Sequence, residues 1–99
     1  MIRPTLNIKG SVVDNLISPT LNINGSSADD LIQPRHDAYC ALQDAIKALQ
    51  RVTPNGRDYP GQPDQCDADR QTHYARIKVL HSMAFGIVIE AADIKEQTK

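Results

Sequence analysis

An arginine, an aspartate and a tyrosine follow one another in a stretch rich in helix-breaking residues. Arg57, Asp58 and Tyr59 lie inside residues 54–63, which contain three prolines and two glycines. On an exposed loop, a guanidinium fork, a carboxylate and a phenol can bind an anionic ligand or a partner. In the competing, structural interpretation, Tyr59 folds back onto the helices and Arg57 pairs with Asp58 or Asp64. We take these three residues as the candidate ligand or partner loop.

Three side chains that can ligate zinc are spaced so that two helices can bring them together. His36 and Cys40 are four residues apart, and the expected helix pairing places His81 opposite them. Such a set forms at most an open zinc site, because it supplies three ligands. Dense Cys-x-x-Cys spacings are absent, and a fourth ligand would have to come from elsewhere. We therefore interpret the three as ordinary surface or seam residues and predict no metal and no other cofactor.

A nucleophile–base pair of Cys66 and His73 is excluded by its spacing. The two residues are seven positions apart on one expected helix, a separation of about 10 Å. A catalytic hydrogen bond requires roughly 3 Å. The chain also has no phosphate-binding loop, dinucleotide-binding fingerprint or nucleophile elbow. We therefore expect no catalytic residues and a protein that is not an enzyme.

The last third of the chain has the pattern of a long helix with one buried seam. From His73 to Thr98 apolar residues recur at alternating spacings of three and four, namely Ile77, Leu80, Ala84, Ile87, Ala91 and Ile94. This rhythm is typical of a helix that packs one stripe against another helix. Gly86 is the single interruption, at a cost of about 1 kcal/mol. The sequence predicts a second long helix over residues 64–98, with Asp64 as its cap.

A first long helix is expected over residues 34–53, ahead of a loop at 54–63. Its apolar stripe comprises Leu42, Ala45, Ile46, Leu49 and Val52, extended by Ala38 and Tyr39. A helix that starts near Ser27 either kinks at Pro34 or ends before it. Two helices joined by a short loop pack antiparallel. Counting back from the loop places Val52 near Asp64 and Pro34 near Ser82.

The first third of the chain is an internal duplication. Residues 4–18 align without gaps on residues 19–33, with ten of the fifteen positions identical. Each copy reads as a short β-capable strand, a glycine turn and a helix cap, for which Ser26 or Ser27 serves in the second copy. The fold class that follows is a mainly α protein, an antiparallel helical hairpin with a short β-capable duplicated N-terminal segment. All 99 residues are expected to form one domain.

The composition narrows the classes of partner and the compartment. A net charge of −1 gives no general attraction to nucleic acid, and four aromatic residues with no tryptophan do not build a stacking platform. The longest apolar run, Met83–Ile89, is too short to span a bilayer, and no secretory signal is apparent. We expect a soluble, cytoplasmic protein that binds neither membrane nor nucleic acid. Cys40 and Cys66 are expected to be free thiols, because the helix pairing separates them.

The expected register leaves part of the second helix without enough neighbours. Between Ser82 and Asp93 this helix is apolar on nearly every side, so one opposing helix cannot cover it. The strand around Leu21 and Ile23 also needs a partner, within the chain or across a two-fold axis. We predict a homo-oligomer, a dimer or higher. Its interface is expected to contain Phe85, Val88, Ile89, Leu21 and Ile23.

The cap unit and the loop together resemble a group of small uncharacterised proteins. Leu21 to Ser27 with Asp30-Leu31, followed by a helical hairpin whose loop is Pro54 to Tyr59, resembles small proteins of phages and prophages. This resemblance implies no activity. The function expected is that of a non-enzymatic, self-associating helical accessory protein, phage-derived, that binds a macromolecular partner. The alternative is a protein that binds a nucleotide-like anion through residues 57–59 at a subunit junction.

Overall fold

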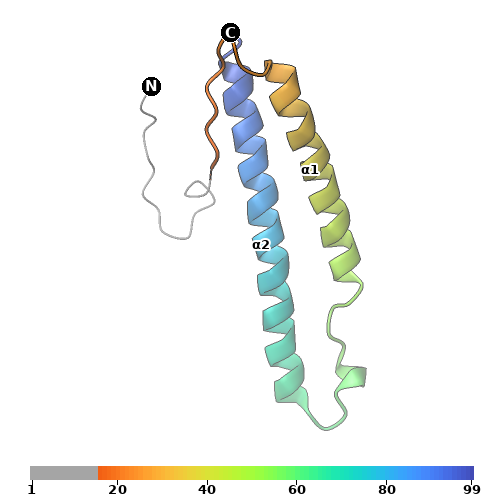
Figure 1. The fold of residues 1–99 in the computed structure, drawn as a ribbon. Helices are drawn as coiled ribbons and strands as arrows, with labels where there is room; N and C mark the ends of the chain where they lie inside the picture. The colour runs from red at the N-terminus through yellow and green to blue at the C-terminus, as the bar shows by residue number, and fades with distance from the viewer. Residues whose placement is uncertain (1–15) are drawn as a thin grey trace.

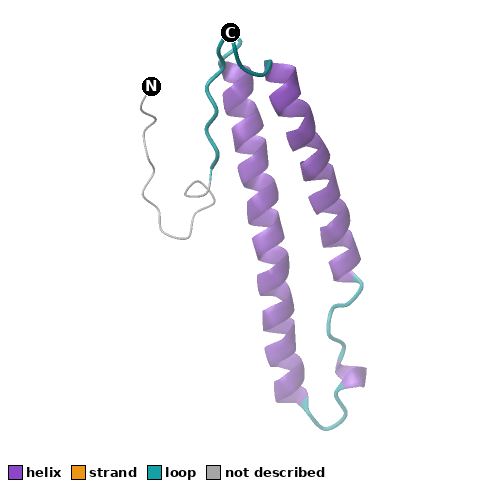
Figure 2. Cartoon of the chain, viewed as in Figure 1, coloured by secondary structure: helices purple, strands orange, loops and turns teal. Residues whose placement is uncertain are grey.

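The computed structural model describes residues 16–99 and shows two long helices side by side (Figure 1). Helix α1 spans Ala28–Gln50, the 3-10 turn η2 spans Gly56–Asp58, and helix α2 spans Pro63–Glu96. The two helices run antiparallel, and the described residues form no strand (Figure 2). The predicted helical hairpin is therefore confirmed.

On each helix, the residues that face the other helix recur at alternating spacings of four and three. On α2 the six seam residues predicted from the sequence are all buried or half-buried, and the same row continues back through His73, Arg70 and Cys66. The matching row on α1 consists of Ala28, Ile32, Arg35, Tyr39, Leu42, Ile46 and Leu49. Facing rows with this seven-residue period are the arrangement of a coiled coil. Ile46, Cys66, Ala84 and Ile94 are the buried apolar residues of the described chain.

The register between the helices differs from the predicted one by about nine residues. Thr53 contacts His73, and Arg35 contacts Glu90, whereas counting from the loop placed Pro34 near Ser82. The reason is that α1 ends at Gln50 and the connecting chain runs along α2 instead of turning at once. The stretch from Ser82 to Asp93 is consequently not an overhang. It lies beside the first half of α1.

The first helix begins six residues earlier than the predicted start at residue 34. Ser27 is the N-cap, and its Oγ accepts a 3.1 Å hydrogen bond from the backbone N–H of Asp30. Asp29 and Asp30 occupy the first turn, where the helix dipole favours negative charge. The helix then continues through Pro34 without ending. Of the two arrangements considered for this proline, the structure excludes a helix that stops at Gln33.

The second repeat copy forms a turn where a strand was predicted. Residues 21–23 have no strand pairing, and the backbone N–H of Gly25 donates to the carbonyl of Asn22 at 3.1 Å. The side chain of Asn22 folds over this turn and accepts from the N–H of Asn24 at 3.0 Å. A Cβ atom on Gly25 would lie 3.0 Å from the Asn22 amide, so a larger residue here would require that side chain to shift. The strand predicted for the first copy, residues 6–8, lies outside the described residues.

Helix α2 begins one residue before the predicted start, and its cap differs from the prediction. Pro63 is the first helical residue, where its missing N–H costs nothing, and Asp64 lies within the first turn. The N-cap residue is Gln62, whose side chain makes no capping hydrogen bond. Gly61, with φ of +71°, supplies the reversal that leads into the helix.

Candidate functional site

The loop 57–59 is fastened to α2 through its tyrosine. The hydroxyl of Tyr59 donates a 2.5 Å hydrogen bond to Oδ2 of Asp69, and the amide of Gln65 donates to Oδ1 of the same carboxylate at 2.8 Å. The hydrogen bond to Asp69 raises the pKa of Tyr59 to about 12, with smaller contributions from burial and nearby charges. The same bond, with that from Gln65, lowers the pKa of Asp69. Tyr59 therefore folds back onto the helix, as the structural interpretation predicted.

Arg57 and Asp58 stay at the surface of the η2 turn. Both side chains are exposed, and the turn is capped by Asn55, whose Oδ1 accepts from the backbone N–H of Arg57 at 3.0 Å. The three predicted loop residues therefore do not converge on one point. The phenol of Tyr59 is bound to Asp69, and the exposed side chains of Arg57 and Asp58 are left to meet a ligand.

Two shallow hollows flank the fastened tyrosine. One has a volume of about 370 Å³ and lies between the end of α1 and the side of α2; it is lined by Leu49, Val52, Pro54, Tyr59, Asp69, Thr72, His73 and Arg76. The other has a volume of about 300 Å³ and is lined by Gly56, Tyr59, Gly61, Pro63, Cys66, Asp67 and Arg70. Arg70 is held in place because its Nε donates to the carbonyl of Pro54 at 3.0 Å. Neither hollow contains Arg57.

The zinc-ligand candidates come together only in part. Nε2 of His36 lies 3.7 Å from Sγ of Cys40 on the exposed face of α1. The register places His81 more than one turn of α2 away from this pair, since Arg35 already faces Glu90. Within residues 16–99, no three His, Cys, Asp or Glu side chains are grouped so that they can hold a metal ion. Cys40 and Cys66 are free thiols, as predicted.

His73 and Cys66, the excluded dyad, are both buried in the seam. His73 contacts the hydroxyl of Thr53 through Nε2 at 3.0 Å, and that hydroxyl also lies 2.7 Å from the carbonyl of Gln50. Because a carbonyl only accepts, the Thr53 proton goes to Gln50 and His73 is the donor in the other bond. The histidine therefore caps the end of α1 through Thr53.

The predicted interface residues differ in exposure. Phe85 is 57% exposed and Val88 45%, and they lie one turn apart on the same side of α2. Ile89 and Leu21 are half-buried, whereas Ile23 is almost fully exposed at the turn that follows Leu21. The structure thus places two of the five on one open apolar surface of α2, away from the turn that carries Ile23.

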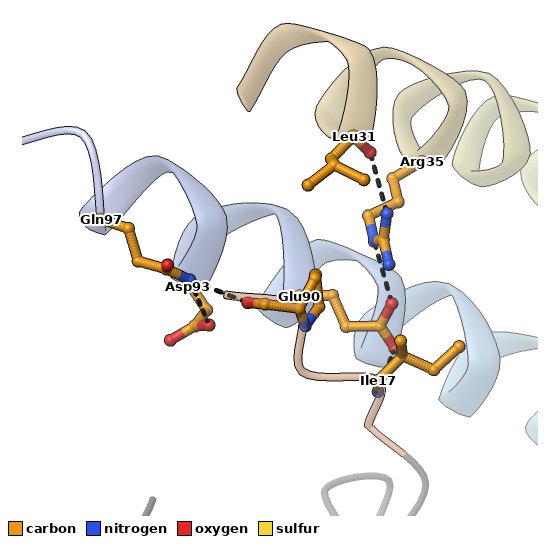
Figure 3. A network of polar contacts seen from close by, with 7 residues as sticks. Ile17, Leu31, Arg35, Glu90, Asp93 and Gln97 are labelled. Carbon is orange, nitrogen blue, oxygen red and sulfur yellow. Dashed lines mark hydrogen bonds and ion pairs between the residues drawn. The ribbon is translucent and has the colours of Figure 1, made fainter. Parts of the chain in front are cut away.

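A buried ion pair, which the sequence analysis missed, lies on the other side of α2. Nε of Arg35 donates to Oε1 of Glu90 at 3.1 Å, and the side chains are 17% and 8% exposed. Nη1 of Arg35 also donates to the carbonyl of Leu31, and Oε2 of Glu90 accepts from the N–H of Ile17 (Figure 3). A signal was present, because Glu90 is the single charged residue between Ser82 and Ala92. A buried carboxylate requires a cation or several donors.

Gln97, seven residues after Glu90, binds the N-terminal segment to which Ile17 belongs. Its Oε1 accepts from the backbone N–H of Leu21 at 2.9 Å, and its Nε2 donates to the carbonyl of Pro19 at 3.1 Å. The amide is steadied by a 3.4 Å contact with Asp93, which Figure 3 also shows. Residues 17–21 are thereby bound to α2 through main-chain groups, and no pattern in the sequence indicated this contact.

The comparisons with known proteins assign no family to this architecture. None of the helices in residues 16–99 is long and apolar enough to cross a membrane. No family model, curated protein or solved structure matches the chain. The resemblance to small phage and prophage proteins consequently stays a prediction.

Proposed function

We propose that this chain is a non-enzymatic helical protein that self-associates and acts by binding a macromolecular partner. The observation that carries the proposal is the open apolar surface formed by Phe85 and Val88, which we call the Phe85 surface. At 100° per residue, these side chains point about 140° and 160° away from Glu90, where the N-terminal segment is bound. Within the described chain, neither α1 nor that segment covers them.

The thin core of the hairpin supports a second copy as the occupant of this surface. Four apolar residues are buried among those described, and two of them, Cys66 and Ala84, are small. Two helices alone bury each other along one stripe, whereas covering the opposite side of α2 removes more apolar surface from water. Each large side chain buried in this way contributes about 1.5–3 kcal/mol. A two-fold contact between Phe85 surfaces supplies this burial, because the same patch serves both copies.

The mass in solution tests the proposal. We expect light scattering at micromolar concentration to give a multiple of 10.9 kDa. Replacing both Phe85 and Val88 by glutamate is expected to give a monomer that is still helical. The matched control is Val52→Glu, since Val52 is 65% exposed but lies past the end of α1. A wild-type mass of 10.9 kDa would rule out self-association.

A further inference from the structure

The C-terminal end of α2 binds an extended peptide by its backbone. Three groups of the N-terminal segment are held, and they belong to alternate residues: the N–H of Ile17, the C=O of Pro19 and the N–H of Leu21. Alternate residues of an extended chain point to the same side, so one edge of the segment faces α2. On α2 these groups are bound by the carboxylate of Glu90, which accepts, and by the amide of Gln97, which both accepts and donates. We call this pair, with the surface between them, the Glu90–Gln97 clamp.

The clamp contacts main-chain N–H and C=O groups, so a segment with the same spacing of these groups offers it the same three hydrogen bonds. The bound heptapeptide is Ile17-Ser18-Pro19-Thr20-Leu21-Asn22-Ile23. The sequence contains it a second time, as Ile2-Arg3-Pro4-Thr5-Leu6-Asn7-Ile8, with six of the seven residues identical. The two copies are fifteen residues apart. The described residues therefore contain a clamp with one segment bound to it, and the sequence contains a near-copy of that segment.

We propose that residues 2–6 are a second ligand of the Glu90–Gln97 clamp and exchange with residues 17–21 within the same chain. In the exchanged state, the N–H groups of Ile2 and Leu6 and the carbonyl of Pro4 take the places of their counterparts. Both segments are tethered to the chain that carries the clamp, so each is present at a high effective concentration. The tether from the bound leucine to Ala28 is 6 residues long for the second copy and 21 for the first. Loop closure favours the shorter tether by roughly sixfold, a ratio that leaves both states populated.

A set of single and double proline substitutions tests the exchange, because proline has no backbone N–H to donate to Oε1 of Gln97. Leu21→Pro disables the second segment and Leu6→Pro the first. If the segments replace each other, Leu6→Pro alone leaves the melting temperature unchanged. Leu21→Pro alone then lowers it by less than the double variant does. An equal loss in Leu21→Pro and in the double variant overturns the proposal, since the first segment then rescues nothing.

Two controls make the result specific to the clamp in one chain. Thr5→Pro and Thr20→Pro introduce proline next door while keeping the N–H groups that bind Gln97, so each is expected to behave as wild type. In a Gln97→Ala background the Leu21→Pro and double variants should no longer differ. The difference in melting temperature between Leu21→Pro and the double variant, which measures the rescue, is also followed over a hundredfold range of concentration. Rescue that weakens on dilution would mean that the segment comes from a second copy, and it would overturn exchange within the chain.

Discussion

The hydroxyl of Tyr59 donates a 2.5 Å hydrogen bond to Asp69, ten residues further along the chain, and joins the interhelical loop to the first turns of α2. This bond explains why the loop follows the helix instead of turning sharply. It also moves the pKa values of its two partners in opposite directions, up for the phenol and down for the carboxyl.

We expect the hydrogen bond between Tyr59 and Asp69 to make the stability of the protein fall at both low and high pH. The lowered pKa of Asp69 means that its contribution is present above the ordinary carboxyl range and is lost as pH falls through the lowered value. The raised pKa of Tyr59 means that its contribution is complete below pH 10 and is lost as pH rises toward about 12. Absorbance titration of phenolate formation should reveal one tyrosine that ionises near 12. In Asp69→Asn this ionisation should return toward 10; no change would show that the hydrogen bond is absent in solution.

Pro34→Ala should stabilise the protein by about 1–3 kcal/mol. Pro34 lies inside α1, where it has no N–H for the carbonyl of Asp30, and its side chain is exposed. Alanine restores that hydrogen bond and loses no buried contact. The control is Pro63→Ala, at the first position of α2, where proline is already compatible with the helix. Urea denaturation measures both; a destabilised Pro34→Ala would mean that the helix needs its proline.

Arg35→Met should destabilise the protein by about 3 kcal/mol, because it leaves the buried Glu90 carboxylate without its cation. The double variant Arg35→Met, Glu90→Leu should lose less than Arg35→Met alone, since no buried charge remains. Lys99→Met is the control: it breaks the Lys99–Glu96 ion pair, whose side chains are 72% and 69% exposed, and should have almost no effect. Equal losses in Arg35→Met and the double variant would contradict a buried charge pair.

Leu80→Asp should unfold the hairpin, whereas Val79→Asp should leave it folded. Leu80 lies in the seam that faces α1, and a carboxylate there has no partner in the described chain. Val79 is one residue away and 58% exposed. Circular dichroism at 25 °C with a thermal scan compares the two. Similar melting temperatures would show that the seam is not where the helices meet.

Local pattern was enough to predict the hairpin but not how its halves are aligned. The three-and-four spacing of apolar residues on α2 is repeated every turn, so Leu80 and Ile94 could be assigned to one face. The register depends on a single connection, and nothing local in residues 51–62 requires it to run along α2. That path is set by tertiary bonds such as the one from Arg70 to Pro54.

The repeat shows why the structure of the N-terminal segment was harder to predict from the sequence than that of the hairpin. Leu16-Ile17 and Leu31-Ile32 are equivalent pairs, each two residues from a proline, yet the first is extended and the second helical. A residue before proline normally avoids the helical region, and Ser18 follows that preference. Gln33 is helical because α1 is anchored on both sides, by the Ser27 cap and by the bond of Arg35 to Glu90. Tertiary contacts therefore decide the conformation of two similar local sequences.

The length of the hairpin has a hydrodynamic consequence. The molecule extends over 63 × 28 × 18 Å and has a radius of gyration of 18.4 Å, compared with about 13 Å for a compact chain of 100 residues. Such a rod meets more friction than a sphere of equal mass, so a single chain travels through a porous matrix ahead of globular standards. A monomer is therefore itself expected to elute early in size-exclusion chromatography. The number of copies in the assembly follows only from a measurement of mass, such as light scattering.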